Sequence, residues 1–175
     1  MTAARKLSSR SRREPFQRRA RVFNAPREMV WKAWTEREAL EEWWGPKGCA
    51  IEVEELDVSA GGTFHYSMGM ADGSKWWGIF HYEEVVKLER IVFVNSFSNE
   101  AGDITRAPFS ESWPKEIRNV VTFHDEGGRT RLELRGQPVR ATAEECAFFE
   151  GMFGSMQQGF GGTFDQLESY LATQK

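Results

Sequence analysis

The side chains with the widest range of chemistry in this sequence are three histidines and two cysteines. If His65 and His81 face each other across a β-hairpin, two imidazoles with no thiolate or carboxylate at ligand spacing are still too few for a closed zinc site. We therefore interpret them as an exposed cross-strand pair and predict no metal site. His124 precedes a turn and is interpreted as a surface residue. Cys49 and Cys146 lie far apart and match no zinc or redox spacing, which fits a reducing compartment.

Motifs for catalysis are scarce. The sequence contains no nucleophile elbow, no glycine-rich loop that would cradle a phosphate, and no helical pair of metal-binding histidines. Glutamate-rich stretches such as Glu52–Glu55 are typical of solvated faces, and no carboxylate is placed on an apolar face where it could transfer protons. The sequence predicts no catalytic residue and no cofactor. It favours a protein that is not an enzyme and leaves that question open.

Aromatic residues are unusually abundant, with 7 Trp, 13 Phe and 3 Tyr in 175 residues. An Asp-Gly-Ser turn predicts a hairpin. A three-residue turn would place Phe64 opposite Tyr82 and Tyr66 opposite Phe80. Trp76 would share their face. Because side chains alternate between the two faces of a strand, this aromatic face is expected to point inward.

Two asparagines interrupt apolar runs on neighbouring predicted strands. Asn95 lies on one face with Phe97, and Asn119 lies among the apolar residues of the next strand. A buried amide needs hydrogen-bond partners in the protein, in water or in a ligand. The favoured interpretation is that the two amides bond to each other or to the backbone. The alternative is that they orient the polar end of an apolar ligand, as the hydroxyls of Tyr66 and Tyr82 could also do.

Hydrophobic spacing and turn residues predict the elements that must position these side chains. They indicate a strand, two short helices, six antiparallel strands and one long helix. The expected ranges are 17–23 for the first strand, 25–45 for the two helices, 50–58, 63–70, 75–86, 91–97, 116–124 and 129–137 for the later strands, and 142–173 for the last helix. A bulge is expected near Glu54-Glu55, where the parity of the apolar residues changes.

The helix ends carry their own signals. Asn24 or Ala25 is expected to cap the first helix, and Thr35 with Glu38 and Thr142 with Glu145 are predicted capping boxes of the later ones. Three glycines interrupt the last helix, and each costs up to about 1 kcal/mol relative to alanine in a helix interior. We expect a kink or a very close approach to the sheet to compensate; the glycines are Gly159, Gly161 and Gly162.

The predicted fold class is α+β. A long apolar helix must bury its stripe, and only the sheet is large enough to receive it. We therefore expect a curved antiparallel sheet wrapped around the C-terminal helix, with a ligand cavity between them. The candidate ligand-binding residues are Phe64, Tyr66, Trp76, Phe80, Tyr82, Asn95, Phe97, Trp113, Asn119, Met152, Met156 and Phe160.

Charge is distributed unevenly along the chain. Residues 1–21 hold eight basic residues and only Glu14 as an acid, whereas the rest carries 15 basic and 25 acidic residues. We expect residues 1–16 to form a flexible basic arm, interpreted as a solvated tail, and residues 17–175 to form one domain. An acidic body argues against nucleic-acid binding by the folded part. Since no apolar run is long enough for a transmembrane helix or a secretory signal, we expect a cytoplasmic protein without a membrane span.

Several motifs, in this order, resemble the START-like (SRPBCC) superfamily and, more closely, the family named for the activator of the heat-shock chaperone ATPase. They are RVFNAPR at 21–27, VWKAWT at 30–35, WWGPKG at 43–48 and GFGGTFDQL at 159–167. The resemblance covers about residues 17–173 and implies a helix-grip fold, in agreement with the architecture above. Members of the superfamily bind lipids, hormones or polyketides, and some cyclise polyketides. The resemblance implies no catalytic residue for this sequence.

Three functions follow as hypotheses. The leading one is binding of a small hydrophobic, apolar or aromatic ligand between the sheet and the last helix. The alternative is a protein-interaction module, as a co-chaperone-like ATPase activator with a chaperone partner or as a homodimer. Trp77, Ile79 and the Trp43-Trp44 pair would then be exposed anchors. The resemblance also implies a third, an enzyme of the polyketide-cyclase type that polarises a carbonyl with an inner-face tyrosine or amide.

Overall fold

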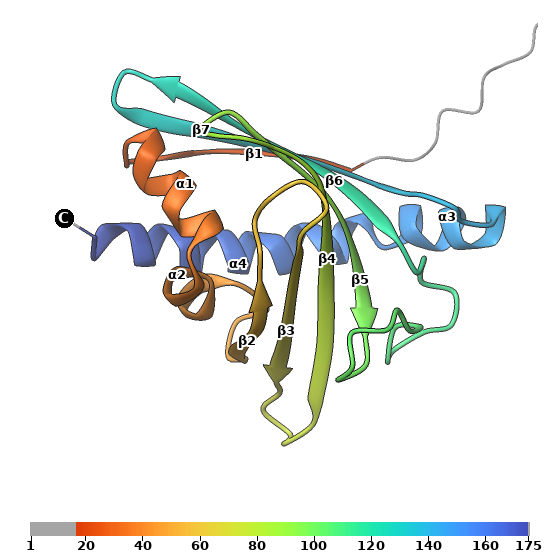
Figure 1. The fold of residues 1–175 in the computed structure, drawn as a ribbon. Coiled ribbons are helices and arrows are strands. Elements are labelled where there is room, and N and C mark those ends of the chain that lie inside the picture. Colours follow the sequence, from red (N-terminus) through yellow and green to blue (C-terminus); the bar gives the residue numbers. More distant parts are fainter. Residues whose placement is uncertain (1–16, 175) are drawn as a thin grey trace, which may run out of the picture.

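The computed structural model describes residues 17–174, so the predicted basic arm at 1–16 lies outside the described residues. It contains one seven-stranded antiparallel sheet and four helices. The elements in chain order are β1 (Gln17–Phe23), α1 (Arg27–Thr35), α2 (Arg37–Trp43), β2 (Ala50–Leu56), β3 (Thr63–Gly69), β4 (Lys75–Val86), β5 (Arg90–Ser98), β6 (Ile117–Glu126), β7 (Arg129–Pro138), α3 (Ala143–Gly151) and α4 (Phe153–Ala172) (Figure 1). None of these helices is long and apolar enough to cross a membrane.

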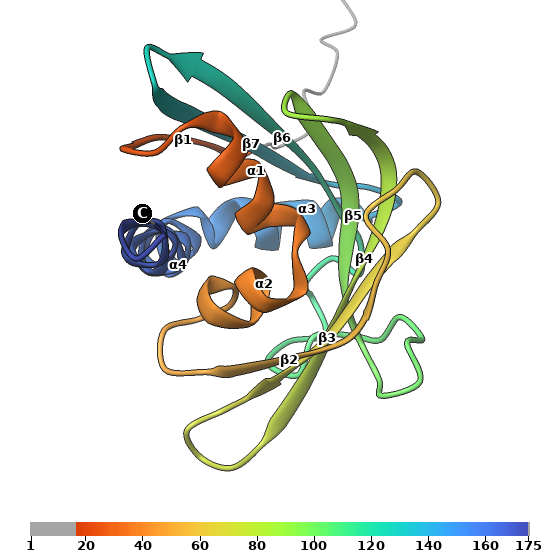
Figure 2. The same ribbon diagram turned by 60° about the vertical axis from the view of Figure 1, so that its left-hand side comes forward.

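The sheet curves around helix α4. Its strand order is β1-β7-β6-β5-β4-β3-β2, so β1 pairs with the last strand of the chain. Figure 2 shows α4 nearly end-on, on the concave side of the sheet, with α1 and α2 beside it. The buried side of α4 carries Phe164, Leu167 and Leu171 at helical spacing, and the Phe164 ring meets that of Phe23 in β1 edge-on at 5.9 Å. This is the helix-grip α+β fold that the sequence predicts.

The predicted single C-terminal helix is in fact two helices. The capping box of Thr142 and Glu145 is confirmed at the start of α3. Helix α3 ends at Gly151 and α4 begins at Phe153, because Met152 between them leaves helical geometry, with φ −94° and ψ 3°. Glycine has a low helix propensity, so Gly151 itself favours a break at this point. The apolar residues continue at helical spacing on both sides and therefore gave no sign of it.

The expected close approach to the sheet at the three glycines of α4 is wrong. The helix is continuous through Gly159, Gly161 and Gly162. A Cβ atom at any of the three would meet no atom of the described residues within 4 Å. Steric demand therefore does not explain these glycines.

This open space predicts that alanine is tolerated there. We expect Gly161→Ala and Gly162→Ala each to raise the free energy of unfolding by up to about 1 kcal/mol, because alanine restricts the unfolded chain and suits a helix. Urea unfolding followed by circular dichroism measures this. As a control, Gly73→Ala should lower the free energy of unfolding by about 1–2 kcal/mol, because Gly73 has φ +88° in a turn. A loss of stability at Gly161 and Gly162 would contradict the open space.

Two other helix-end predictions are wrong. The N-cap of α1 is Pro26, not Asn24 or Ala25. Thr35 does not cap α2: its hydroxyl donates back to the carbonyl oxygen of Trp31 at 2.9 Å, and Glu36 takes the N-cap position. Threonine near a helix C-terminus has this local alternative, which competes with capping the next helix.

The β3–β4 hairpin has the predicted inner face but a different register. Phe64 pairs with Phe80 and Tyr66 pairs with Gly78, so Tyr82 is not opposite Phe64. The connection comprises Met70–Ser74 and not a three-residue turn. Because the two registers differ by an even number of residues, every side chain keeps its face. The bulge predicted in β2 is confirmed between Val53 and Glu55.

The convex face of this hairpin is covered, contrary to expectation. His65 pairs with Ile79 and not with His81, so the predicted histidine pair does not form. His65 is only 7% exposed; its ring stacks on Trp77 at 5.2 Å, and its Nε2 lies 3.1 Å from the carbonyl oxygen of Asn99. The connection after β5 folds back over this face and buries Ile79 as well.

Candidate functional site

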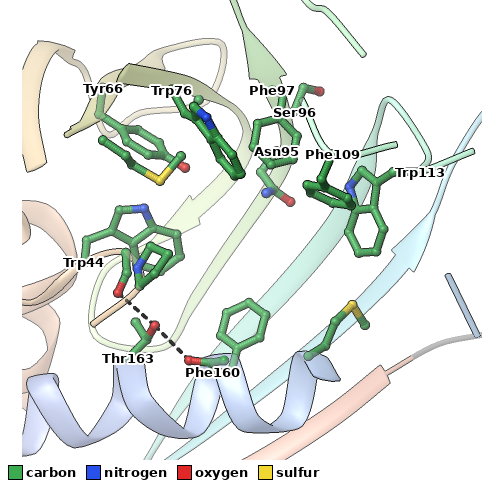
Figure 3. A pocket seen from close by; sticks show the side chains of 16 residues that line it. Trp44, Tyr66, Trp76, Asn95, Ser96, Phe97, Phe109, Trp113, Phe160 and Thr163 are labelled. Carbon is green, nitrogen blue, oxygen red and sulfur yellow. Dashed lines mark hydrogen bonds between the residues drawn. The ribbon is translucent and has the colours of Figure 1, made fainter. Parts of the chain in front are cut away.

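A cavity of about 360 Å³ lies between the concave face of the sheet and helix α4 (Figure 3). Strands β3, β4 and β5 form one wall, α4 forms the opposite wall, and the connections after α2 and after β5 close the ends. The lining residues are Trp44, Gly45, Pro46, Tyr66, Met68, Trp76, Gly78, Asn95, Ser96, Phe97, Phe109, Trp113, Met156, Gly159, Phe160 and Thr163.

Seven of the twelve candidate residues line this cavity. They are Tyr66, Trp76, Asn95, Phe97, Trp113, Met156 and Phe160. Inward-pointing positions on β3 to β5 and one face of α4 bring six of them together, as the strand and helix periods predict, and Trp113 comes from the connection between β5 and β6.

The other five candidates lie outside the cavity lining. Phe64, Phe80 and Tyr82 are buried in the hydrophobic core beside it. The Phe80 ring stacks on Phe93 at 4.0 Å, so it fills core space and leaves none for a ligand. Asn119 is buried on β6, and Met152 occupies the break between α3 and α4.

Of the nine lining residues that are not among the sequence candidates, four come from connections and five from β3, β4, β5 and α4. Trp44, Gly45 and Pro46 follow α2, and Phe109 lies in the connection between β5 and β6. The Trp43-Trp44 pair, expected as an exposed anchor, is buried, with Trp43 fully enclosed and Trp44 9% exposed. The sequence signal for this burial was the Trp-Trp pair itself, because tryptophan side chains are on average highly buried.

The Trp-Trp-Gly-Pro segment is held against α4 by one carbonyl group. The carbonyl oxygen of Gly45 accepts hydrogen bonds from Thr163 Oγ1 and from Gln166 Nε2, both at 2.9 Å. Gly45 has φ +90°, and a Cβ there would lie 2.6 Å from Ile51 Cδ1. Only glycine therefore fits this turn, which directs the Trp44 ring into the cavity.

Tyr66 lies flat across its partner strand because Gly78 has no side chain. A Cβ at Gly78 would lie 2.5 Å from the Tyr66 hydroxyl oxygen. Burial raises the pKa of Tyr66 to about 12, an effect partly offset by the indole N–H of Trp44. In Figure 3 that indole nitrogen faces the Tyr66 hydroxyl, although the pair lacks regular hydrogen-bond geometry. The phenol is therefore neutral and protonated at physiological pH.

Asn95 and Asn119 are bonded to each other, which is the favoured of the two sequence interpretations. Asn119 Nδ2 donates to Asn95 Oδ1 at 2.8 Å and to the carbonyl oxygen of Ile117 at 3.1 Å. Of the two residues, Asn119 is buried and lies outside the cavity lining, whereas Asn95 is half-buried and lines the cavity. The wall of the cavity thus contains one amide that a second amide holds in place.

Aromatic rings from the connection after β5 cover one end of the cavity. The Phe109 ring lies 6.4 Å from Trp76, 5.7 Å from Phe97 and 5.6 Å from Trp113, centre to centre. Trp113 in turn contacts Phe149 of α3 at 5.5 Å. Figure 3 shows Phe109 and Trp113 side by side at this end. Phe109 is 48% exposed, so this end is where the cavity is nearest to solvent.

The cavity wall is uncharged. The described residues that line it include no Asp, Glu, Lys, Arg, His or Cys. Its polar groups are hydroxyls, one amide and indole N–H groups. Such a wall suits hydrogen bonding to a neutral molecule and offers no group that titrates near neutral pH.

The fold and this cavity define a START-like, helix-grip protein, and comparison with known proteins specifies the family. Residues 24–172 match the model of the family described as Activator of Hsp90 ATPase homolog 1-like protein. The chain therefore belongs to that family, whose fold is that of a ligand-binding or interaction module. Among functionally curated protein sequences, none matches this chain.

Solved structures with the same fold come from several bacteria. Protein Ms6760 from Mycobacterium smegmatis is 24% identical with a TM-score of 0.73, covering 89% of this chain and 90% of that one. A protein from Arthrobacter aurescens is 24% identical with a TM-score of 0.76, covering 91% and 87%. The AHSA1 protein from Silicibacter pomeroyi is 16% identical with a TM-score of 0.70, covering 92% and 100%. At these identities the likeness shows the fold alone.

Proposed function

We propose that this protein binds a small apolar or aromatic ligand in the cavity between β3–β5 and α4. The observation that carries the proposal is a space of about 360 Å³ left open beneath aromatic side chains that fill the rest of the core. Ligand cavities commonly measure about 300–1,000 Å³ and combine apolar walls with a few placed polar groups. Protein interiors are otherwise close-packed, so a space of this size without a ligand would cost stability.

The alternatives have less support. An interaction module through exposed anchors loses three of its four supporting residues, because Trp43, Trp44 and Ile79 are buried, and the fourth, Trp77, is half-buried. A cyclase retains Tyr66 and Asn95 at the cavity to polarise a carbonyl, but turnover would also need a group that exchanges protons with its substrate. Tyr82 lies outside the cavity, and the raised pKa of Tyr66 disfavours proton loss. Cys49 carries a free thiol, which supports a reducing, cytoplasmic location as part of the proposal.

A larger side chain on α4 that fills the cavity should weaken ligand binding strongly. We expect Met156→Trp to weaken binding of the neutral fluorescent probe N-phenyl-1-naphthylamine at least about tenfold, because an indole at a lining position occupies the ligand's volume. Fluorescence titration measures the probe's Kd, and circular dichroism checks that the variant is folded.

The matched control is Gln158→Trp. It places the same side chain on the same helix at an exposed position that does not line the cavity. The probe's Kd should then stay within about twofold of the original value. Equal loss of binding in both variants, or none in either, would contradict this location of the site.

A further inference from the structure

The orientation of the Asn95 amide follows from a chain of hydrogen bonds that starts at the backbone. The carbonyl oxygen of Ile117 can only accept, so the Asn119 atom 3.1 Å from it must be the amide nitrogen. Gly136 on β7 leaves room for the other end of this side chain, since a Cβ there would lie 2.8 Å from Asn119 Oδ1. The Asn119 amide therefore has one orientation.

The same nitrogen determines the orientation of Asn95. Asn119 Nδ2 lies 2.8 Å from the Asn95 side chain, and because it donates, the atom it meets is the oxygen Oδ1. The Nδ2 group of Asn95 is thus the end of the amide that this hydrogen bond leaves free. Asn95 consequently presents an N–H donor at the cavity wall.

Two other groups of the cavity wall can donate a hydrogen bond, namely the Tyr66 hydroxyl, which can also accept one, and the Trp44 indole N–H. Burial raises the pKa of Tyr66, so its hydroxyl keeps its proton. The Trp44 indole N–H is buried without a regular acceptor. The described lining residues thus present Asn95 Nδ2 as a free donor and include no cation. A carboxylate there would be buried without a counter-charge, and an ammonium would meet no carboxylate.

From this arrangement, and resting on the proposed function, we infer that the ligand is a neutral aromatic molecule with a carbonyl-type acceptor oxygen. The oxygen accepts a hydrogen bond from Asn95 Nδ2, and the ring system lies among Trp76, Phe97 and Phe160. Asn119 does not touch the ligand: it is a positioning residue, since it forces the Asn95 amide to show its nitrogen to the cavity.

Three naphthalenes of nearly identical shape test this inference by calorimetric titration. They are 2-acetylnaphthalene, which carries a neutral carbonyl, 2-isopropenylnaphthalene, which lacks the oxygen, and 2-naphthoate, which is charged. We expect 2-acetylnaphthalene to bind at least about tenfold more tightly than 2-naphthoate. We expect Asn95→Leu to weaken 2-acetylnaphthalene about tenfold and to change 2-isopropenylnaphthalene by less than about twofold.

Asn95→Asp serves as the isosteric second variant. The new carboxylate still accepts from Asn119 Nδ2, but it presents an acceptor to the cavity in place of the donor. We therefore expect this variant, too, to bind 2-acetylnaphthalene more weakly than the original protein does. Asn119→Asp removes both donors of Asn119, which releases the Asn95 amide to turn. The carbonyl stretching frequency of bound 2-acetylnaphthalene should lie at the hydrogen-bonded, lower value in the original protein and rise in these variants. This readout depends on the amide's orientation and not on stability alone.

Each outcome decides between the alternatives. If all three probes bind alike, or if Asn95→Leu and Asn95→Asp weaken 2-acetylnaphthalene and 2-isopropenylnaphthalene equally, the inference is overturned while ligand binding stands. Tightest binding of 2-naphthoate also overturns it. If none of the three binds and Met156→Trp leaves the neutral probe unaffected, the proposed function fails as well.

Discussion

Replacing Trp43 by alanine is expected to lower the free energy of unfolding by about 3–5 kcal/mol. The Trp43 side chain is fully buried, and its ring meets those of Trp34 at 4.9 Å and Trp44 at 5.5 Å. Its indole N–H donates to the carbonyl oxygen of Ala33 at 2.7 Å. That carbonyl is in the last turn of α1 and has no partner within the helix, so the substitution opens a cavity and leaves a buried acceptor unpaired.

Urea unfolding of Trp43→Ala and Trp43→Phe separates these two contributions. Trp43→Phe keeps most of the ring packing and loses the hydrogen bond, so its loss should be well below that of alanine. Trp77→Ala is the matched control, because Trp77 lies half-buried on the convex face of the sheet. An equal loss for Trp77→Ala and Trp43→Ala would contradict the account of a tryptophan cluster that joins α1, α2 and the cavity.

Gly78→Ala is expected to damage stability and binding together. The new methyl group would lie 2.5 Å from the Tyr66 hydroxyl oxygen and 2.6 Å from Cζ, far inside contact distance. The Tyr66 ring is stacked on Phe64 at 4.6 Å and edged by Trp44, so the open direction for its movement is the cavity. We expect a loss of about 1–3 kcal/mol and at least a tenfold weaker Kd for N-phenyl-1-naphthylamine.

Two further variants make this prediction specific. Gly69→Ala is the control in the same hairpin, since a Cβ there would lie 3.5 Å from Ala50 Cβ, an ordinary contact. It should leave stability and probe binding nearly unchanged. In a double-mutant cycle, Gly78→Ala should cost less stability in a Tyr66→Ala background than in the original protein, because the clashing ring is then absent. If Gly78→Ala behaves like Gly69→Ala, the close approach of Tyr66 to the strand is wrong.

The fold was predictable because each of its elements has a strong period. The alternation in β3 and β4 placed Tyr66 and Trp76 on the inner face even though the predicted register was wrong by two residues. The length of the turn sets the register, and an Asp-Gly-Ser sequence is compatible with more than one loop length. The break at Met152 was not predictable from the stripe, because apolar residues continue at helical spacing on both sides.

The candidate site was predictable mainly where it lies on regular elements, with Trp113 as the exception. Met156 and Phe160 follow from the helix period, and Asn95 and Phe97 follow from the strand period. Phe109 lies in a connection without periodicity, so only the three-dimensional structure shows that it reaches the cavity. Spacing also does not separate residues that fill the core from residues that border an open space, because both point inward. For that reason the sequence candidates include Phe64, Phe80 and Tyr82, which fill the core. Trp44 is not a candidate, because it lies in a connection after α2 where spacing does not apply.

The central claim is tested most directly by a crystal structure of the protein with 2-acetylnaphthalene. The account predicts electron density for the naphthalene between Phe97 and Phe160, with its ketone oxygen within hydrogen-bond distance of Asn95 Nδ2. Ligand density elsewhere on the protein, or a cavity closed by Phe109 and Trp113 with no ligand inside, would contradict it.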